Sequence, residues 1–139
     1  MAVQAHRRAL DIRERIHAPD DPALASGLNW LALALQDTGR YAEAEPLYQR
    51  SLTIWEKVLG PEHPDVANSL NNLARLYQDT GRLAEAEPLY ERAIAILEKA
   101  LPPEHPNRIG VRENYAVLLD KLGRTAEAGA LRGQAEANR

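Results

Sequence analysis

The sequence predicts an all-α protein, a right-handed solenoid of antiparallel helix pairs with about seven helices. Similar sequence motifs recur along the chain. The glycines Gly39, Gly81 and Gly123 stand 42 residues apart, and an arginine follows each of them. Apolar residues between these glycines recur at helical spacing. Hydrophobic residues make up 45% of the chain but Phe is absent, which favours helices over strands. An internal period of this size is typical of arrays whose units bury their apolar faces against each other.

Composition excludes several classes of protein. The formal net charge is −3, so the chain lacks the basic footprint of a nucleic-acid binder. No cysteine is present, which excludes disulfides and thiol catalysis. The first residues carry charges in place of a signal peptide's apolar core, and no run approaches the roughly 18 apolar residues of a membrane span. We therefore expect a cytoplasmic protein with neither nucleic acid nor membrane as a partner.

The chain divides into repeats, and residues 1–139 are expected to form a single array. Residues 1–17 align with the second helix of a unit, so the chain opens on the trailing helix of a partial repeat. Repeat 1 is expected at 22–59, repeat 2 at 64–101 and a degenerate C-terminal capping repeat at 106–139. The helix at 2–16 lacks a preceding partner, and its aliphatic side chains favour self-association into a homo-oligomer.

Each repeat is expected to open with a helix that starts at a proline, since Pro suits the first helical position. These first helices should run from Pro22 to about Asp37, from Pro64 to about Asp79 and from Pro106 to about Lys121. Apolar residues of the middle one form a single stripe along the helix. They are Val66, Leu70, Leu73, Ala74 and Tyr77.

Second helices follow the turn glycines, which should close the preceding helix with a positive φ. They are expected at about 42–59, 84–101 and 126–137. A small residue recurs near each start, where neighbouring helices should approach closely. These residues are Ala44, Ala86 and Ala128. The inward set of the first of these helices is expected to comprise Ala44, Leu47, Tyr48, Ser51, Leu52, Trp55 and Val58.

The third unit changes character. Arg108 and Arg112 stand where the second unit has Val66 and Leu70. A polar outer face suits a terminal repeat that faces water. The sequence therefore predicts that this unit closes the array.

The motifs LNNLARLY, GRLAEAEPLYERAIAI and GPEHPDVA resemble the tetratricopeptide repeat, in the long 42-residue variety of kinesin light chain and its bacterial relatives. This resemblance covers essentially the whole chain. It implies stacked helix pairs whose first helices line a concave groove that binds a peptide segment of a partner protein.

Alignment on the turn glycines predicts the residues of this peptide-binding groove. Asparagine amides can both donate to and accept from an extended peptide backbone. Arg75 could pair with a ligand carboxylate, and Trp30 or Leu33 could hold an apolar anchor. The candidate set is Asn29, Trp30, Leu33, Gln36, Asn68, Asn71, Asn72, Arg75, Gln78, Asp79, Glu113 and Asn114.

Several of these residues also have an interpretation that involves no ligand. Asn29 and Asn71 could belong to a solvated helix face. Trp30 would more often be a packing residue than a ligand anchor. His63 and His105 each follow a glutamate, but both recur as copies of one connector, which favours helix capping over metal binding or catalysis.

No HExxH, P-loop or nucleophile motif occurs, so we expect no enzyme, no metal and no cofactor. The function that the sequence favours is a non-enzymatic scaffold that binds a peptide of a partner protein. A self-assembling structural module that forms a homodimer or longer superhelix through residues 2–16 is the alternative.

Overall fold

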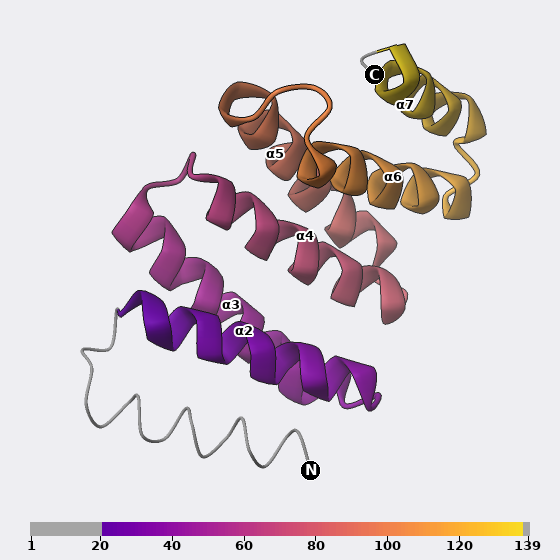
Figure 1. Ribbon diagram of the computed structural model, residues 1–139. Helices are drawn as coiled ribbons and strands as arrows, with labels where there is room; N and C mark the ends of the chain where they lie inside the picture. Colours follow the sequence, from indigo (N-terminus) through magenta and orange to yellow (C-terminus); the bar gives the residue numbers. More distant parts are fainter. Residues whose placement is uncertain (1–20, 138–139) are drawn as a thin grey trace. The chain divides into compact units, whose positions relative to one another are not determined.

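The computed structural model describes residues 21–137, and all regular secondary structure within them is helical (Figure 1). The expected helix at 1–17 lies outside the described residues. The six described helices are α2 (Pro22–Asp37), α3 (Tyr41–Leu59), α4 (Pro64–Asp79), α5 (Leu83–Ala100), α6 (Pro106–Lys121) and α7 (Thr125–Ala137). The chain forms two compact units, Met1–Ser69 (unit 1) and Leu70–Arg139 (unit 2), whose boundary falls inside α4.

The first helix of each repeat begins at the expected proline, and a side chain one residue earlier accepts a hydrogen bond from its first turn. Asp21 Oδ1 accepts from the Ala23 N–H at 2.7 Å. His63 Nδ1 accepts from Asp65 N–H at 3.0 Å, and His105 Nδ1 accepts from Asn107 N–H at 3.1 Å. Both histidines therefore act as helix caps, as the repeated connector indicated.

The turn glycines close the first helices as predicted. Their φ values are +79° at Gly39, +81° at Gly81 and +79° at Gly123. In each turn the arginine after the glycine donates its backbone N–H to a carbonyl five residues earlier, for example Arg82 to Tyr77 at 2.8 Å. This pattern is the Schellman motif, and a side chain at the glycine would cost about 1–2 kcal/mol.

In unit 1, α2 and α3 pack against each other and bury an aliphatic core. Its α2 side is Leu24, Ala25, Leu28, Leu31, Ala32 and Leu35, and its α3 side is Ala44, Tyr48 and Ile54. Ser51 Oγ donates to the Ala25 carbonyl at 2.9 Å, which satisfies a fully buried hydroxyl. The small side chain of Ala44 has no exposed surface, in agreement with the predicted close approach.

The inward set expected for α3 was partly wrong. Val58 is 43% exposed, and Trp55 is only partly buried, whereas Ile54 is 3% exposed. One helical turn takes 3.6 residues, so Ile54 and Trp55 both lie about one turn after the buried Ser51, on neighbouring sides of the helix. The smaller aliphatic side chain enters the core, and the large indole remains at its edge.

Unit 2 builds its core from the rest of α4 and from α5, α6 and α7, with α6 packed against both α5 and α7. Buried side chains are Leu70, Leu73, Ala74, Leu76 and Tyr77 in α4, and Ala86, Tyr90, Ala93, Ile96 and Leu97 in α5. In α6 and α7 they are Val111, Tyr115, Ala116, Leu118, Leu119 and Ala128.

The water-facing role expected for Arg108 and Arg112 was wrong. Arg108 is 8% exposed and Arg112 is 4% exposed. Both project from α6 toward the last turn of α5, where Arg108 Nη1 donates to the Leu101 carbonyl at 3.0 Å and Arg112 Nη2 lies 3.1 Å from Glu98 Oε1. One nitrogen of each guanidinium has a protein acceptor, and the packing of α6 on α5 buries both side chains.

Candidate functional site

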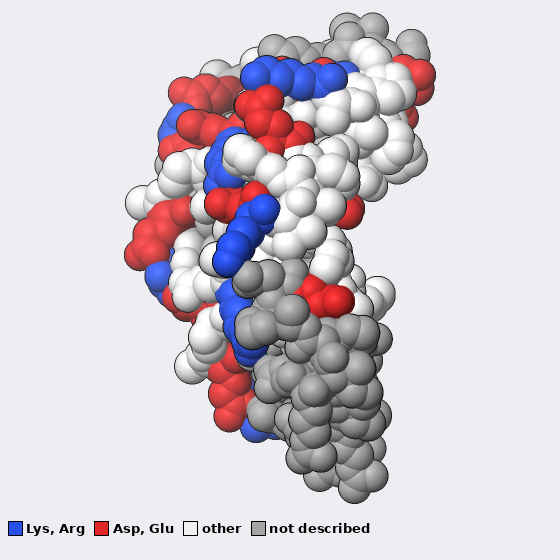
Figure 2. Space-filling model, turned by 90° about the vertical axis from the view of Figure 1, so that its left-hand side faces the viewer, with Lys and Arg blue, Asp and Glu red and all other residues white. Residues whose placement is uncertain are grey.

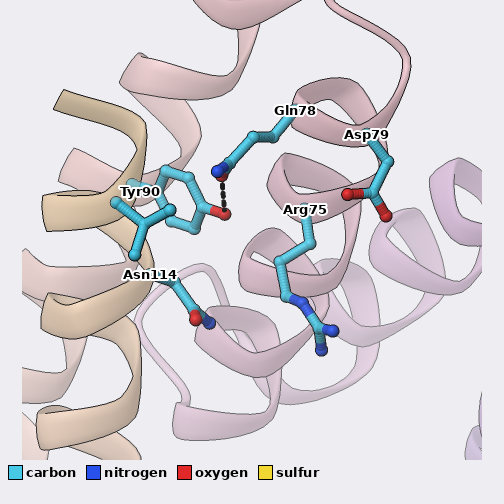
Figure 3. A pocket seen from close by; sticks show the side chains of 6 residues that line it. Arg75, Gln78, Asp79, Tyr90 and Asn114 are labelled. Atoms are coloured by element: carbon cyan, nitrogen blue, oxygen red, sulfur yellow. Dashed lines mark hydrogen bonds between the residues drawn. The ribbon is translucent and has the colours of Figure 1, made fainter. Parts of the chain in front are cut away.

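Unit 2 contains a small open pocket of about 90 Å³ between α4, α5 and α6. Its lining residues are Arg75, Gln78, Asp79, Tyr90, Asn114 and Val117 (Figure 3). Four of them belong to the groove residues expected from the sequence: Arg75, Gln78, Asp79 and Asn114. Gln78 and Asp79 follow Arg75 by about one helical turn, so the three residues lie on one side of α4.

One wall of the pocket is fixed by a hydrogen bond between helices. The Tyr90 hydroxyl donates to Gln78 Oε1 at 2.9 Å (Figure 3). Burial raises the pKa of Tyr90 well above its ordinary value, so the phenol stays a donor at neutral pH. The bond occupies the Gln78 oxygen and leaves the Gln78 amide N–H groups as donors for a ligand.

Arg75 supplies the positive charge of the pocket. Its side chain is exposed, and no acceptor among residues 21–133 engages its guanidinium. A guanidinium presents five N–H donors in a planar fork that matches a carboxylate. The structure thus leaves the strongest anion-binding group of the predicted groove available.

A pair of asparagines joins α4 to α6 beside the pocket. Asn114 Nδ2 donates to Asn71 Oδ1 at 3.0 Å. This bond leaves the Asn71 amide as a donor and the Asn114 oxygen as an acceptor, the two groups that a peptide backbone requires. Asn68 and Asn72 are half-buried on α4 and do not line the pocket.

The predicted groove residues on α2, in unit 1, range from exposed to buried. Trp30 is 58% exposed, which does not fit the plainer alternative of a packing residue. Asn29 and Leu33 are half-buried on the same helix. Gln36 is 8% exposed, and its Oε1 accepts from the Tyr48 hydroxyl at 2.8 Å. Gln36 therefore joins α2 to α3 and presents little surface.

Sequence reasoning missed that the Gln–Tyr pair is periodic. Gln36–Tyr48 and Gln78–Tyr90 recur one repeat apart, and the third repeat has Asp120 and Arg132 at these positions. There an ion pair of 2.9 Å replaces the neutral hydrogen bond. Arg132 also lies 3.2 Å from Glu113, which engages that predicted groove residue within the protein. The sequence signal for this contact was that both positions change together, from Gln and Tyr in two repeats to Asp and Arg in the third.

A second polar cluster, the Glu87 cluster (Glu87, Glu91, Tyr115 and Arg124), connects α5, α6 and α7. The Tyr115 hydroxyl lies 2.6 Å from Glu87 Oε2 and 3.0 Å from Glu91 Oε1. Arg124 Nη1 lies 2.7 Å from Glu87 Oε2. The hydrogen bond from Arg124, and then the one from Tyr115, lower the pKa of Glu87. Burial, and then the hydrogen bond to Glu87, raise the pKa of Tyr115.

Surface charge is mixed in sign. Figure 2 shows Lys and Arg side chains next to Asp and Glu side chains on the face that it displays. Among the described residues, no group of three or more His, Asp or Glu side chains could hold a metal ion. None of the described helices is both long enough and apolar enough to cross a membrane.

Paired helices with a 42-residue period, each pair closed by a glycine turn, define a helical repeat protein. The family profile of the tetratricopeptide repeat matches residues 23–99 and 77–138, so the chain belongs to the tetratricopeptide repeat family. Proteins of this family generally act as scaffolds for protein–protein interaction, and the match indicates no catalytic family.

Solved structures narrow the resemblance to kinesin-light-chain-like repeats. A Podosopora anserina protein assigned as a kinesin light chain, with nearly identical TPR-like repeats, is 32% identical with a TM-score of 0.88. The match covers 97% of this chain and 64% of that one. BtubC (BKLC) from P. vanneervenii has a TM-score of 0.90 at 23% identity, over 99% of this chain and 55% of its own, and shows a shared fold. No curated protein sequence matches the chain.

Proposed function

We propose that the chain is a non-enzymatic scaffold that binds an extended segment of a partner protein through its predicted groove residues. The observation that carries this proposal is the pocket of unit 2, where Arg75 lies beside side-chain amides that retain unused donors and acceptors. Such a set recognises a peptide, because a backbone offers alternating N–H and C=O groups and an acidic side chain offers a carboxylate.

The chemistry of the pocket favours a segment with an acidic residue. Arg75 can take a carboxylate in a bidentate pair, and the Gln78 amide can donate to the same group. Asn71 and Asn114 would hold the flanking backbone irrespective of its sequence. Val117 is 36% exposed at the edge of the pocket and would contact an aliphatic part of the segment.

Trp30 in unit 1 supports a second contact of a different kind. An exposed Trp is a frequent anchor of protein interfaces, because its large surface is rigid and has a polar edge. Leu33 lies one turn further along α2, so the two side chains form an apolar patch. We infer that this patch binds an apolar residue of a partner.

The test is a library of immobilised peptides, followed by fluorescence anisotropy on the tightest binders. Arg75→Gln should weaken an acidic peptide by about 10- to 100-fold, because a hydrogen bond to a charged group contributes about 1.5–3 kcal/mol. Lys57→Gln removes one exposed charge from α3, outside the groove, and should leave affinity unchanged.

Unaltered affinity in both Arg75→Gln and Asn71→Ala, with intact helical circular dichroism, would exclude the pocket as the binding site. The same measurement on Trp30→Ala separates the two contacts, since loss there alone would assign the ligand to unit 1.

A further inference from the structure

Arg108 and Arg112 are the only charged residues that the structure buries among residues 21–133. They stand four residues apart on α6, so their side chains leave the same face of the helix. Buried arginines are uncommon unless their charges are paired and their N–H groups are hydrogen-bonded. Neither residue lines the pocket described above.

The hydrogen bonds of this pair are incomplete. Arg108 Nη1 donates to the Leu101 carbonyl and Arg112 Nη2 to Glu98, as described above. The Nε atoms of both arginines and Nη1 of Arg112 are buried and have no acceptor among the described residues. A buried donor without a partner destabilises the folded state, and more so when the group is charged.

The charges do not balance either. Among the described residues, Glu98 is the one carboxylate that contacts the pair, and its side chain is 46% exposed. Two buried cations therefore face one half-exposed anion, which leaves about one positive charge uncompensated in a region shielded from water. Such an arrangement is costly unless a further negative group completes it.

We propose that a small inorganic anion of the chloride class binds at the α5–α6 corner and accepts hydrogen bonds from the unpartnered N–H groups of Arg108 and Arg112. The donors are closed to solvent, which excludes a carboxylate carried on a partner protein and leaves a small ion as the class of acceptor proposed. The ion would neutralise the excess charge and complete the hydrogen bonds in a single step. This site is independent of the peptide groove, and its role is to stabilise the last repeat.

The chain provides its own matched variant. Val66 and Leu70 occupy the equivalent positions one repeat earlier, and both are 0% exposed. Arg108→Val with Arg112→Leu therefore replaces the pair by side chains that this fold already accommodates. A control with the same change in charge is Lys99→Gln with Lys121→Gln, both exposed and both in unit 2.

The experiment is urea denaturation across a sodium chloride series, with sodium gluconate holding the ionic strength constant. One bound ion raises the folding equilibrium constant up to about tenfold for each tenfold rise in chloride, once chloride exceeds its dissociation constant. The unaltered chain and the lysine control should show this dependence, and the arginine variant should lose it.

A second measurement is a crystal of the unaltered chain grown in sodium bromide, examined by anomalous scattering. An anomalous peak within hydrogen-bond distance of Arg108 and Arg112 would support the proposal. A flat chloride dependence in the unaltered chain, or ordered water alone beside the two arginines, would overturn it. If the arginine variant does not fold, the bromide crystal decides the question by the same criterion.

Discussion

Position 21 of the sequence and its equivalents one and two repeats later show how different residues perform one task. Asp21, His63 and His105 each accept a hydrogen bond from the backbone two residues on, at 2.7, 3.0 and 3.1 Å. A helix leaves its first N–H groups without intrahelical partners, and a side-chain acceptor at this position satisfies one of them. Imidazole does so through the lone pair of Nδ1, which requires that nitrogen to be unprotonated.

We therefore predict opposite effects for two changes at His105. His105→Ala should lower the free energy of unfolding by about 1 kcal/mol, because α6 loses its cap. His105→Asp should preserve stability or raise it, since a carboxylate caps the helix and also favours the positive end of its dipole. Urea denaturation at neutral pH measures both. Equal losses in the two variants would show that the histidine matters for packing and not for its acceptor.

At the scale of the helices, the Glu87 cluster joins α7 to the helices before it. Arg124 opens α7 and reaches Glu87 of α5, and the Tyr115 hydroxyl of α6 approaches the same carboxylate. Tyr115 stands where earlier repeats have Leu73 and Leu31, so this substitution adds a donor at a position that otherwise contributes only apolar surface. The three helices thus share one acceptor group.

The lowered pKa of Glu87 has a defined consequence for stability against pH. Because the folded state favours the carboxylate, the stabilisation is present above the ordinary pKa of about 4.5 and is lost as pH falls through the lower folded value. Glu87→Gln should therefore cost up to about 1 kcal/mol at pH 7 and progressively less below about pH 4. Urea denaturation at both pH values measures this difference.

Glu104→Gln, at an exposed residue of the α5–α6 connector, is the control and should change stability little at either pH. A cost for Glu87→Gln that is the same at pH 7 and below pH 4 would contradict the assigned role of the Glu87 carboxylate.

At the scale of the molecule, the chain consists of two compact units, and the boundary between them falls inside α4. The stability of a repeat array is the sum of the stabilities of its repeats and of the interfaces between neighbouring repeats. Each of the two units contains buried apolar side chains. Unit 1 combines aliphatic side chains with a single Gln–Tyr bond. Unit 2 adds buried arginines and several ion pairs, which makes the last repeat the more polar part.

The self-association expected from residues 2–16 is also a property of the whole molecule. If these residues form an interface, the solution mass measured by light scattering should rise with concentration for the unaltered chain. Ile12→Glu should return the mass to that of a monomer, because a charge at an apolar interface is costly to bury. Identical monomer masses for both chains across the series would exclude this interface.

The 42-residue period, the prolines and the turn glycines were enough to predict the described helices to within about one residue of their observed ends. Backbone conformation at these points depends on local chemistry, on the fixed φ of Pro22 and on the positive φ that Gly39 adopts without strain. The sequence also predicted Arg75, Gln78, Asp79 and Asn114 as groove residues, and the tertiary structure brings these four together in one pocket.

Burial is what the sequence could not determine. It predicted that Arg108 and Arg112 face water, whereas the structure buries both. Whether a side chain faces water depends on the helix that covers it and on the partners found there, such as the Leu101 carbonyl and Glu98. Local sequence therefore determined where each helix begins and ends, while tertiary packing decided which polar groups are buried, because it brings together groups from different helices.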